Sequence, residues 1–150
     1  MQIIIEMHPR LSGDADMQEI YSEFCWYKEN SNPSEHAAPT RHTQEQYEGL
    51  SSLFGRDRFD KISKDASAED IQHLHVRQEH SVWENSHGDA LVQWACTSDS
   101  YLIYAYFYHA QQHRYYLLEF FRDRGHNLYQ ARVESFIQEA QAYRISIQNH

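Results

Sequence analysis

Three apolar runs in the second half of the chain are separated by very short polar turns, and this spacing restricts the folds available to it. The runs are Leu91–Thr97, Tyr101–Tyr108 and Tyr115–Phe121, with turns at Ser98–Ser100 and His109–His113. Aromatic and β-branched residues favour strands. Turns this short join neighbouring antiparallel strands. The sequence therefore predicts an antiparallel meander.

The remaining elements surround this meander. A row of isoleucines predicts a buried strand at the start of the chain, and alternation predicts a second strand before the meander. We expect strands at Met1–Met7 and Ile71–Arg77, helices at Asp14–Asn30, Thr43–Phe54 and from Asn127 or Gln130 onward, a loop at Asn30–Arg41 and a polar stretch at Asp57–Asp70. Gly55 suits the C-cap of the second helix. Strands grouped after helices predict an α+β fold, and the length fits one domain over residues 1–150.

The net charge of −9 argues against generic nucleic-acid binding. The charge is uneven, because residues 1–53 carry three Lys and Arg against nine Asp and Glu, whereas arginines outnumber acids within 114–132. That stretch is either a local basic site or a set of scattered surface arginines. Two cysteines, Cys25 and Cys96, suggest no disulfide framework. No apolar run approaches the ~20 residues of a membrane span, so we expect a cytoplasmic protein.

Two histidines stand two residues apart on the strand predicted before the meander. His73 and His75 share one face of that strand, and Arg77 continues it. Three polar side chains in a row are hard to bury, so this face is either simply solvated or functional. A third reading is a zinc site completed by His80 or His87, although no Cys or acidic residue completes a recognisable spacing.

Several short segments, in this order, resemble the YafO family of toxin–antitoxin modules. They are Phe54-Gly55-Arg56-Asp57, His73-Leu74-His75-Val76, Thr97-Ser98-Asp99 leading into Leu102-Ile103-Tyr104, then His126 and the helical segment Phe136–Arg144. The resemblance is strongest over residues 54–144. It implies a RelE-like fold, a small antiparallel sheet of three to five strands with helices packed on one face. It also implies a toxin that cleaves mRNA on the translating ribosome, without metal or cofactor, and is neutralised by a cognate antitoxin.

The residue patterns and the resemblance together point to site residues. The expected catalytic residues are His73, His75, His126 and Asp99, and the expected RNA- or phosphate-binding residues are Arg56, Arg77, Arg122, Arg124 and Tyr104. Ribonucleases of this class use the 2′-hydroxyl of the RNA as nucleophile, so the protein needs proton-transfer groups and cations. Two positions depart from the family pattern. Cys96 stands where an arginine is usual, and Tyr129-Gln130 where Ala-Arg is usual.

Each of these residues also has a structural reading. Asp99 fits a turn cap, and Arg56 with Asp57 fits a local ion pair. Tyr104 belongs to a tyrosine-rich run in which one set packs in the core and the other is exposed and able to stack bases. His126 and the arginines before it fit a polar loop that solvates a helix start. The alternative function is therefore a non-catalytic protein of the same fold that binds an antitoxin or a ribosomal component.

Overall fold

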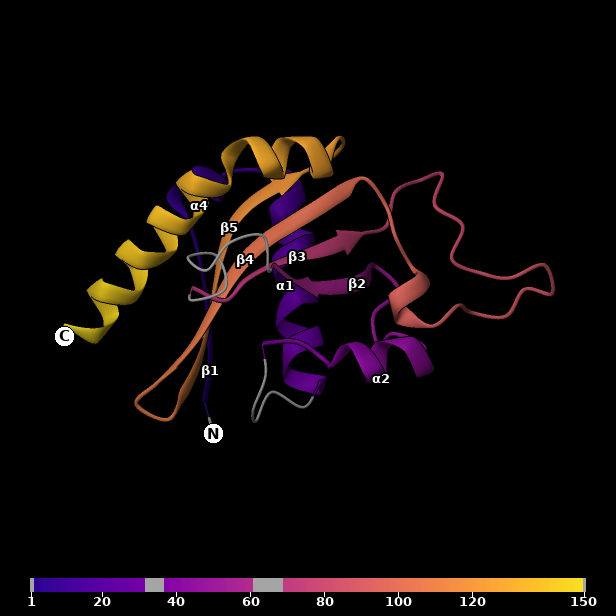
Figure 1. Cartoon of the computed structure of the whole chain (residues 1–150), viewed down its shortest axis with the longest axis horizontal. Coiled ribbons are helices and arrows are strands. Elements are labelled where there is room, and N and C mark those ends of the chain that lie inside the picture. The colour runs from indigo at the N-terminus through magenta and orange to yellow at the C-terminus, as the bar shows by residue number, and fades with distance from the viewer. Residues whose placement is uncertain (1, 32–36, 61–68, 150) are drawn as a thin grey trace.

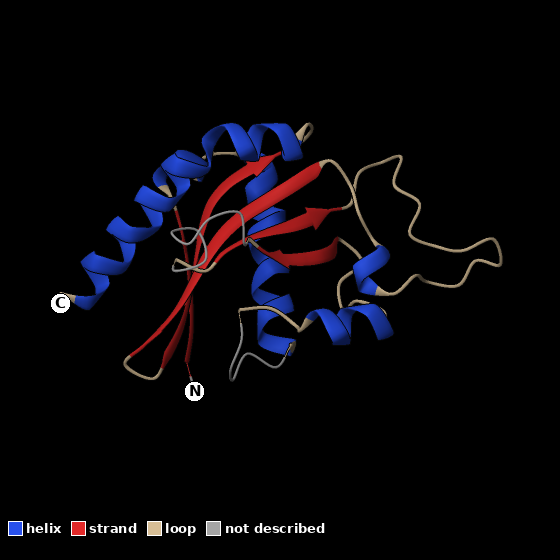
Figure 2. Ribbon diagram, viewed as in Figure 1, coloured by secondary structure: helices blue, strands red, loops and turns tan. Residues whose placement is uncertain are grey.

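A mixed five-stranded sheet with helices on both faces forms the body of the molecule (Figures 1 and 2). The computed structural model describes residues 2–31, 37–60 and 69–149. In chain order the elements are β1 (Gln2–Met7), η1 (Pro9–Leu11), α1 (Ala15–Asn30), α2 (Arg41–Gln46), β2 (Phe54–Phe59), β3 (Ile71–Val76), η2 (Gln93–Ala95), β4 (Ser100–His109), β5 (Gln112–Phe121) and α4 (Gly125–Gln148). This arrangement confirms the α+β class.

The strand order is β1-β5-β4-β3-β2, and all pairs are antiparallel except β1 with β5. The β4–β5 hairpin predicted from the sequence is the longest pair. Its turn places Ala110 and Gln111 at positive φ, 50° and 62°. A two-residue turn with both φ values positive matches the right-handed twist of the flanking strands. Strands β4 and β5 therefore lie inside the sheet, between β3 and β1.

The first strand differs from its expectation in two respects. It runs parallel to β5, which makes the sheet mixed, and it lies at the edge, where its residues are half-buried or exposed. Ile3, Ile5 and Met7 pack toward the core, while Gln2 and Glu6 are exposed. An edge strand has a neighbour on one side only, which explains why the isoleucine run is not fully buried.

Helix α1 covers one face of the sheet. Asp14 caps it, accepting from the backbone N of Asp16 at 3.0 Å. Phe24 and Tyr27 of α1 are fully buried against the sheet residues Leu102 and Tyr104. The helix follows the predicted range closely.

Helix α4 covers the opposite face, whereas the sequence predicted helices on one face only. The reason lies in β4, whose side chains are apolar and buried on both faces of the sheet. Leu102 faces α1, while Ile103 and Ala105 pack with Phe136 and Ile137 of α4. A strand that is apolar on both faces needs a cover on each.

The start of α4 is fixed against the turn before β4. The backbone N of Gly125 donates to the backbone O of Asp99 at 2.7 Å. A Cβ at Gly125 would lie 2.6 Å from the Tyr101 ring, closer than any real contact. The helix therefore begins at Gly125, slightly earlier than predicted.

Two predicted elements are wrong. The helix expected over Thr43–Phe54 ends at Gln46, and the chain then turns into β2 at Phe54. Tyr47 and Leu50, the expected apolar stripe, are 64% and 52% exposed. Gly55 is not a cap but a strand residue whose missing side chain admits the backbone of Cys96. The strand expected over 91–97 contains only the short η2 turn.

The expectations at Met1, at 32–36 of the predicted loop and at 61–68 of the predicted polar stretch lie outside the described residues. Asp57–Phe59, the start of that stretch, belongs to β2. Within the described part of the chain, no helix is both long and apolar enough to cross a membrane.

Candidate active site

A cleft of about 900 Å³ lies where β2, β3, η2 and the starts of α2, β4 and α4 come together. It is lined by Ala37, Ala38, Pro39, Thr40, Arg41, Arg56, Asp57, Arg58, Phe59, Asp60, Asp70, Gln72, His73, His75, Trp94, Tyr101, His126, Tyr129 and Gln130. Four of the nine residues predicted for the site are among them: His73, His75, His126 and Arg56. The structure thus brings together side chains from positions 56 to 126.

Strand pairing sets the cleft floor. In the register of β2 with β3, Arg58 lies opposite His73, and in that of β3 with β4, His75 lies opposite Tyr101. Alternation along a strand then places Arg56 and Arg58 on the same face as the two histidines. The predicted shared face of the histidines is present, and the neighbouring strand adds two cations to it.

His75 is held by the turn before β4. Its Nδ1 lies 2.8 Å from the backbone N of Ser98 and 2.9 Å from the backbone O of Ser98. The side chain is 5% exposed. The pKa of His75 is lowered to about 4, chiefly by burial and also by the nearby Arg56 and Arg58, although the backbone contact to Ser98 acts in the opposite direction. His75 is therefore neutral at physiological pH.

His73 is held by ring contacts. It stacks on Tyr101, with ring centroids 4.9 Å apart and planes 15° apart, and it contacts Tyr129 at 5.5 Å. Its Nδ1 is buried and has no hydrogen-bond partner among the described residues. The pKa of His73 is lowered to about 3, chiefly by burial and also by the nearby His75 and Arg58. This imidazole is also neutral at physiological pH.

Three arginines flank the histidines, and sequence reasoning found only Arg56. The Arg56 guanidinium lies 4.3 Å from the centroid of the Trp94 ring, and its Nε donates to the backbone O of Trp94 at 2.7 Å. The Arg41 guanidinium lies 4.5 Å from the same ring. Arg58 is exposed, and among the described residues it has no ion-pair partner. Arg41 Nε pairs with Glu45 at 2.5 Å, as Arg56 Nε is engaged by Trp94, so the terminal N–H groups of these two side chains and the whole guanidinium of Arg58 are the donors that suit phosphate binding.

The mistaken helix prediction concealed Arg58. A strand over Phe54–Phe59 would have placed Arg56 and Arg58 on one face, but a helix ending at Gly55 left both in a loop. Arg41 reaches the cleft from the first residue of α2, and no local pattern marks that position.

His126 reaches the cleft from the opposite wall. It lies in the first turn of α4 and is exposed. One turn on, the Tyr129 hydroxyl donates to the Asp60 carboxylate, which ties α4 to the end of β2. The backbone N–H groups at a helix N-terminus favour anions. This wall therefore combines an accessible imidazole with a helix start.

Asp99 and Arg77 do not line the cleft. Asp99 is exposed in its turn, and its backbone N–H donates to Gln78 Oε1 at 3.1 Å. Arg77 pairs with Glu84 at 3.0 Å and lies over the Trp83 ring. Both have structural contacts in the segments beside the cleft.

Arg122 and Arg124 also lie outside it. Arg122 forms ion pairs with Asp14 at 2.7 Å and Asp16 at 2.8 Å, which fastens β5 to the start of α1. Those contacts lower the pKa of Asp14 and raise the pKa of Arg122. Arg124 has a left-handed backbone, φ 57°, at the N-cap of α4.

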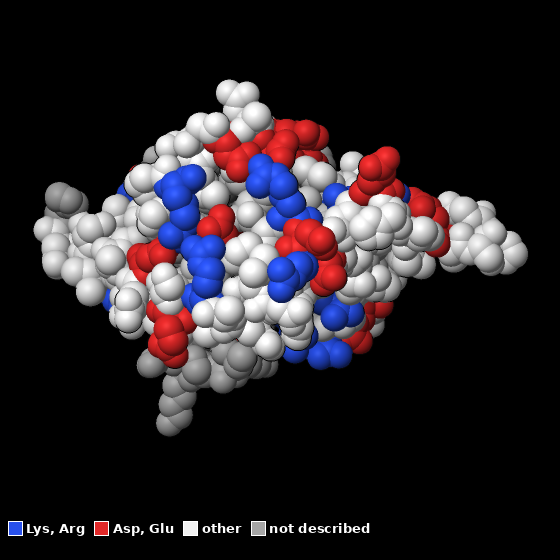
Figure 3. Space-filling view, turned by 90° about the horizontal axis from the view of Figure 1, so that it is seen from above, with Lys and Arg blue, Asp and Glu red and all other residues white. Residues whose placement is uncertain are grey.

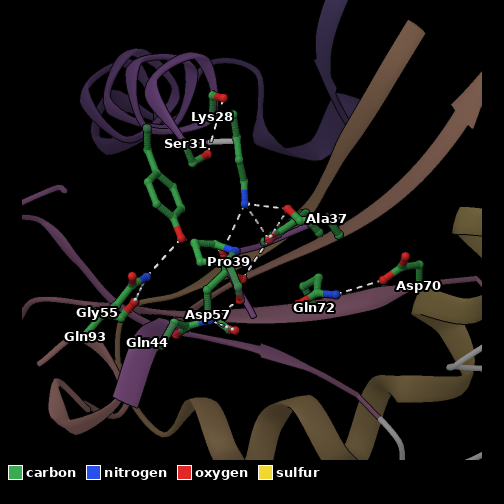
Figure 4. A network of polar contacts seen from close by, with 12 residues as sticks. Lys28, Ser31, Ala37, Pro39, Gln44, Gly55, Asp57, Asp70, Gln72 and Gln93 are labelled. Atoms are coloured by element: carbon green, nitrogen blue, oxygen red, sulfur yellow. Dashed lines mark hydrogen bonds and ion pairs between the residues drawn. The ribbon is translucent and has the colours of Figure 1, made fainter. Parts of the chain in front are cut away.

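Tyr104 is buried on the α1 face and belongs to a polar network with Lys28 and Asp57. Figure 4 shows Lys28 and Asp57 together with Ala37 and Gln44. Lys28 extends from α1 and donates to Asp57 Oδ2 at 2.9 Å, to the backbone O of Ala37 at 2.7 Å and to the Tyr104 hydroxyl at 2.8 Å. Tyr27 and Tyr104 both donate to the Asp57 carboxylate, at 2.8 and 2.7 Å. Burial lowers the pKa of Lys28 and raises those of both tyrosines.

This network supports the cleft from below. Asp57 lies between Arg56 and Arg58 on β2, and Ala37 lies in the cleft wall that leads to Arg41. Gln44 of α2 adds a second tie, since its side chain exchanges hydrogen bonds with the backbone N and O of Asp57 at 3.0 and 2.9 Å. The predicted pairing of Arg56 with Asp57 is therefore wrong, because Asp57 pairs with Lys28 instead.

Elsewhere the surface carries charges of both signs close together, as the view from above shows (Figure 3). Several arginines outside the cleft are paired with acids, in the pairs Arg10–Glu139, Arg77–Glu84, Arg114–Glu6, Arg122–Asp14, Arg132–Glu119 and Arg144–Glu69. The basic character predicted for 114–132 is thus largely neutralised by such pairs. Among the described residues, no group of three or more His, Cys, Asp and Glu side chains is placed to hold a metal ion.

Comparison with known proteins identifies the family. The model of the family described as Toxin YafO, type II toxin-antitoxin system, matches residues 26–145. No curated protein and no solved structure matches the chain. The matched range includes every residue that lines the cleft. The chain therefore belongs to the YafO toxin family of type II toxin–antitoxin systems.

Proposed function

We propose that the protein is a ribosome-dependent endoribonuclease that cleaves mRNA in the cytoplasm during translation, with the cleft as its catalytic site. The observation that carries this proposal is the gathering of three histidines and three arginines around one cleft in a chain of net charge −9. Imidazoles and guanidiniums are the groups that phosphodiester cleavage through the 2′-hydroxyl requires.

The proposed reaction is an internal transesterification. The 2′-oxygen bonds to the adjacent phosphorus as the bond from phosphorus to the 5′-oxygen breaks, leaving a 2′,3′-cyclic phosphate and a 5′-hydroxyl. One proton leaves the 2′-hydroxyl and one is delivered to the 5′-oxygen. His126 is the accessible imidazole for proton transfer, and Arg41, Arg56 and Arg58 bind the phosphate.

Cys96 stands at the position where the family usually has an arginine, and the arginines of the cleft offer a replacement for it. Cys96 is 7% exposed, and its thiol lies 3.5 Å from the backbone O of Val92, away from the cleft lining. We propose that Arg41, Arg56 and Arg58 supply the phosphate contacts that the missing arginine would otherwise make.

Translation of a defined mRNA by purified ribosomes tests the proposal, with 5′ ends of the fragments mapped by primer extension. We expect cleavage by the wild-type protein, and a rate about 10²–10³-fold lower for Arg56→Gln because a preorganised charge contact is lost. Arg132→Gln, which removes a cation paired with Glu119 outside the cleft, is the matched control. Arrest of translation with intact mRNA would instead support the non-catalytic alternative.

A type II system implies a cognate antitoxin, and we propose that it covers the cleft with an acidic or amphipathic segment. Arg58 and His126 are exposed at the cleft and available for such contacts. Chemical modification of His126 by diethyl pyrocarbonate should be slower in the complex than in the free toxin. Equal modification of His126 in both samples would refute the masking, and His87 on a distant loop provides the internal reference.

A further inference from the structure

His73 and His75 occupy the same strand face but differ in what holds their Nδ1 atoms. For His75, a backbone N–H and a backbone O of Ser98 both lie within hydrogen-bond distance of Nδ1. An amide N–H can only donate, so Nδ1 of the neutral ring accepts from it. The single proton of the neutral imidazole then lies on Nε2.

For His73, Nδ1 is enclosed by protein and has no hydrogen-bond partner in the part of the chain that the structure describes. A buried N–H without an acceptor is rare and costly, so the neutral ring places its proton on the other nitrogen. His73 lines the cleft, which makes Nε2 the nitrogen that it presents there. The two imidazoles therefore reach the same tautomer for different reasons.

We propose that His73 and His75 are neutral hydrogen-bond donors to the oxygens of one RNA phosphate, and that neither accepts the proton of the 2′-hydroxyl. This inference rests on the proposed ribonuclease function. A nitrogen that already carries a proton has no lone pair with which to act as a base. Its N–H can instead stabilise negative charge that develops on the phosphate, without moving a proton.

The surroundings of the two rings fit this role. Their centroids are 5.8 Å apart, a separation that two oxygens of one phosphate group bridge through hydrogen bonds. The Tyr101 ring contacts both, at 4.9 and 4.8 Å, and fixes their orientation. Arg56 and Arg58 on the adjacent strand attract the anion and disfavour a charge on either imidazole. Proton transfer is then left to His126 across the cleft.

The tautomers are tested directly by long-range ¹H–¹⁵N NMR spectra of the imidazoles in the wild-type protein at neutral pH. We expect a protonated Nε2 and an unprotonated Nδ1 for both residues. Titration with inorganic phosphate should shift the Nε2 signals of both rings. A protonated Nδ1, a charged ring at either position, or Nε2 signals that phosphate leaves unchanged would overturn the inference.

A pair of substitutions at His73 tests the role in cleavage, because His73 has no protein hydrogen bond to lose. Glutamine retains an N–H donor near the position of Nε2 but cannot accept a proton, while phenylalanine retains the ring stack on Tyr101 and removes the donor. We expect His73→Gln to stay within about tenfold of wild type and His73→Phe to fall by about 10²–10³-fold. His87→Gln, on an exposed loop, is the control.

The outcomes separate this inference from the function on which it rests. If His73→Gln is as slow as His73→Phe, with both folded as judged by thermal melting, the donor role is wrong while the ribonuclease function stands. If His73→Phe is as fast as wild type, His73 does not contact the phosphate. If the wild-type protein cuts no mRNA, the proposed function fails, and the NMR experiment still decides the donor role.

Discussion

His73 and His75 make folding stability depend on pH. In the unfolded chain each takes up a proton near pH 6.5, whereas in the folded protein burial lowers their pKa values to about 3 and about 4. Below pH 6.5 the unfolded state therefore binds more protons than the folded state, and the stability falls as the pH falls. A site that keeps two imidazoles neutral thus destabilises the fold in acid.

The first prediction is a loss of stability between pH 7.5 and pH 5. Each histidine should reduce the free energy of unfolding by about 2 kcal/mol at pH 5, since one pKa unit corresponds to about 1.4 kcal/mol. Urea denaturation at the two pH values measures it. His73→Phe should lose roughly half of this difference, and an unchanged difference in that variant would contradict the assignment.

The second prediction concerns the buried pair Lys28–Asp57, both of whose side chains are fully buried. Asp57→Asn leaves the Lys28 charge without its counter-ion and should destabilise the protein by about 3–5 kcal/mol. Lys28→Met combined with Asp57→Asn should cost less than the sum of the single changes, because it removes the isolated charge. A double-mutant cycle by urea denaturation measures the coupling, and strict additivity would show that the two side chains do not interact.

At the scale of elements, the first turn of α4 couples the core to the cleft. Gly125 packs on the Tyr101 ring with no room for a Cβ, and the next residue is His126. The position of the proposed proton-transfer group thus depends on one close contact between a helix and a strand.

The third prediction follows from this contact. Gly125→Ala should displace the start of α4 and destabilise the protein by about 1–3 kcal/mol, as overpacking does. Cleavage should fall more than the loss of folded protein explains, because His126 moves with the helix. Thermal melting and cleavage are measured together, with Gly88→Ala, where a Cβ meets nothing within 4 Å, as a control for backbone strain alone. Activity lost only in proportion to folded protein would contradict the coupling.

Elements with strong local patterns could be predicted from the sequence, and those set by distant contacts could not. Helix α1, strand β3 and the β4–β5 hairpin follow from their periodicity and turns. Strand β2 (Phe54–Phe59) could not be predicted, because Tyr47, Leu50 and Phe54 have the spacing of an apolar helix face. In the structure Tyr47 and Leu50 are exposed, so that helix face does not exist.

The same distinction applies to the site. His73 and His75 could be found because residues two apart on a strand share a face, and Arg56 and His126 through the family resemblance. Arg41 and Trp94 could not, because they meet only through the packing of α2 and η2 beside β2. Tyr104 was misplaced because the alternation of β4 does not reveal which of its two apolar faces carries α1.

At the scale of the whole molecule, net charge and local charge act in opposite directions. A chain of net charge −9 repels free RNA, while the cleft offers cations to a single phosphate. We therefore expect RNA to enter only when the ribosome presents it, and purified mRNA to remain intact at physiological salt. Efficient digestion of purified mRNA by the protein alone would contradict this expectation.

The fourth prediction compares two arginines whose loss changes the net charge equally. Arg58→Gln removes a cation of the cleft that has no ion-pair partner within residues 2–31, 37–60 and 69–149, and Arg77→Gln removes one that pairs with Glu84 outside the cleft. If the local field governs binding, Arg58→Gln should slow cleavage on translating ribosomes by at least about tenfold and Arg77→Gln should have little effect. If both variants slow cleavage equally in single-turnover assays, the prediction is wrong and Arg77 belongs to the site.

The parallel pairing of β1 with β5 has a consequence for the timing of synthesis. Gln2 pairs with Gln112, so the first strand has no partner until most of the chain has been made. The central strands β4 and β5 and the helix that carries His126 also emerge late. Contacts between such distant segments make folding slow. The cleft, whose lining reaches Gln130, therefore cannot assemble until that part of the chain has left the ribosome.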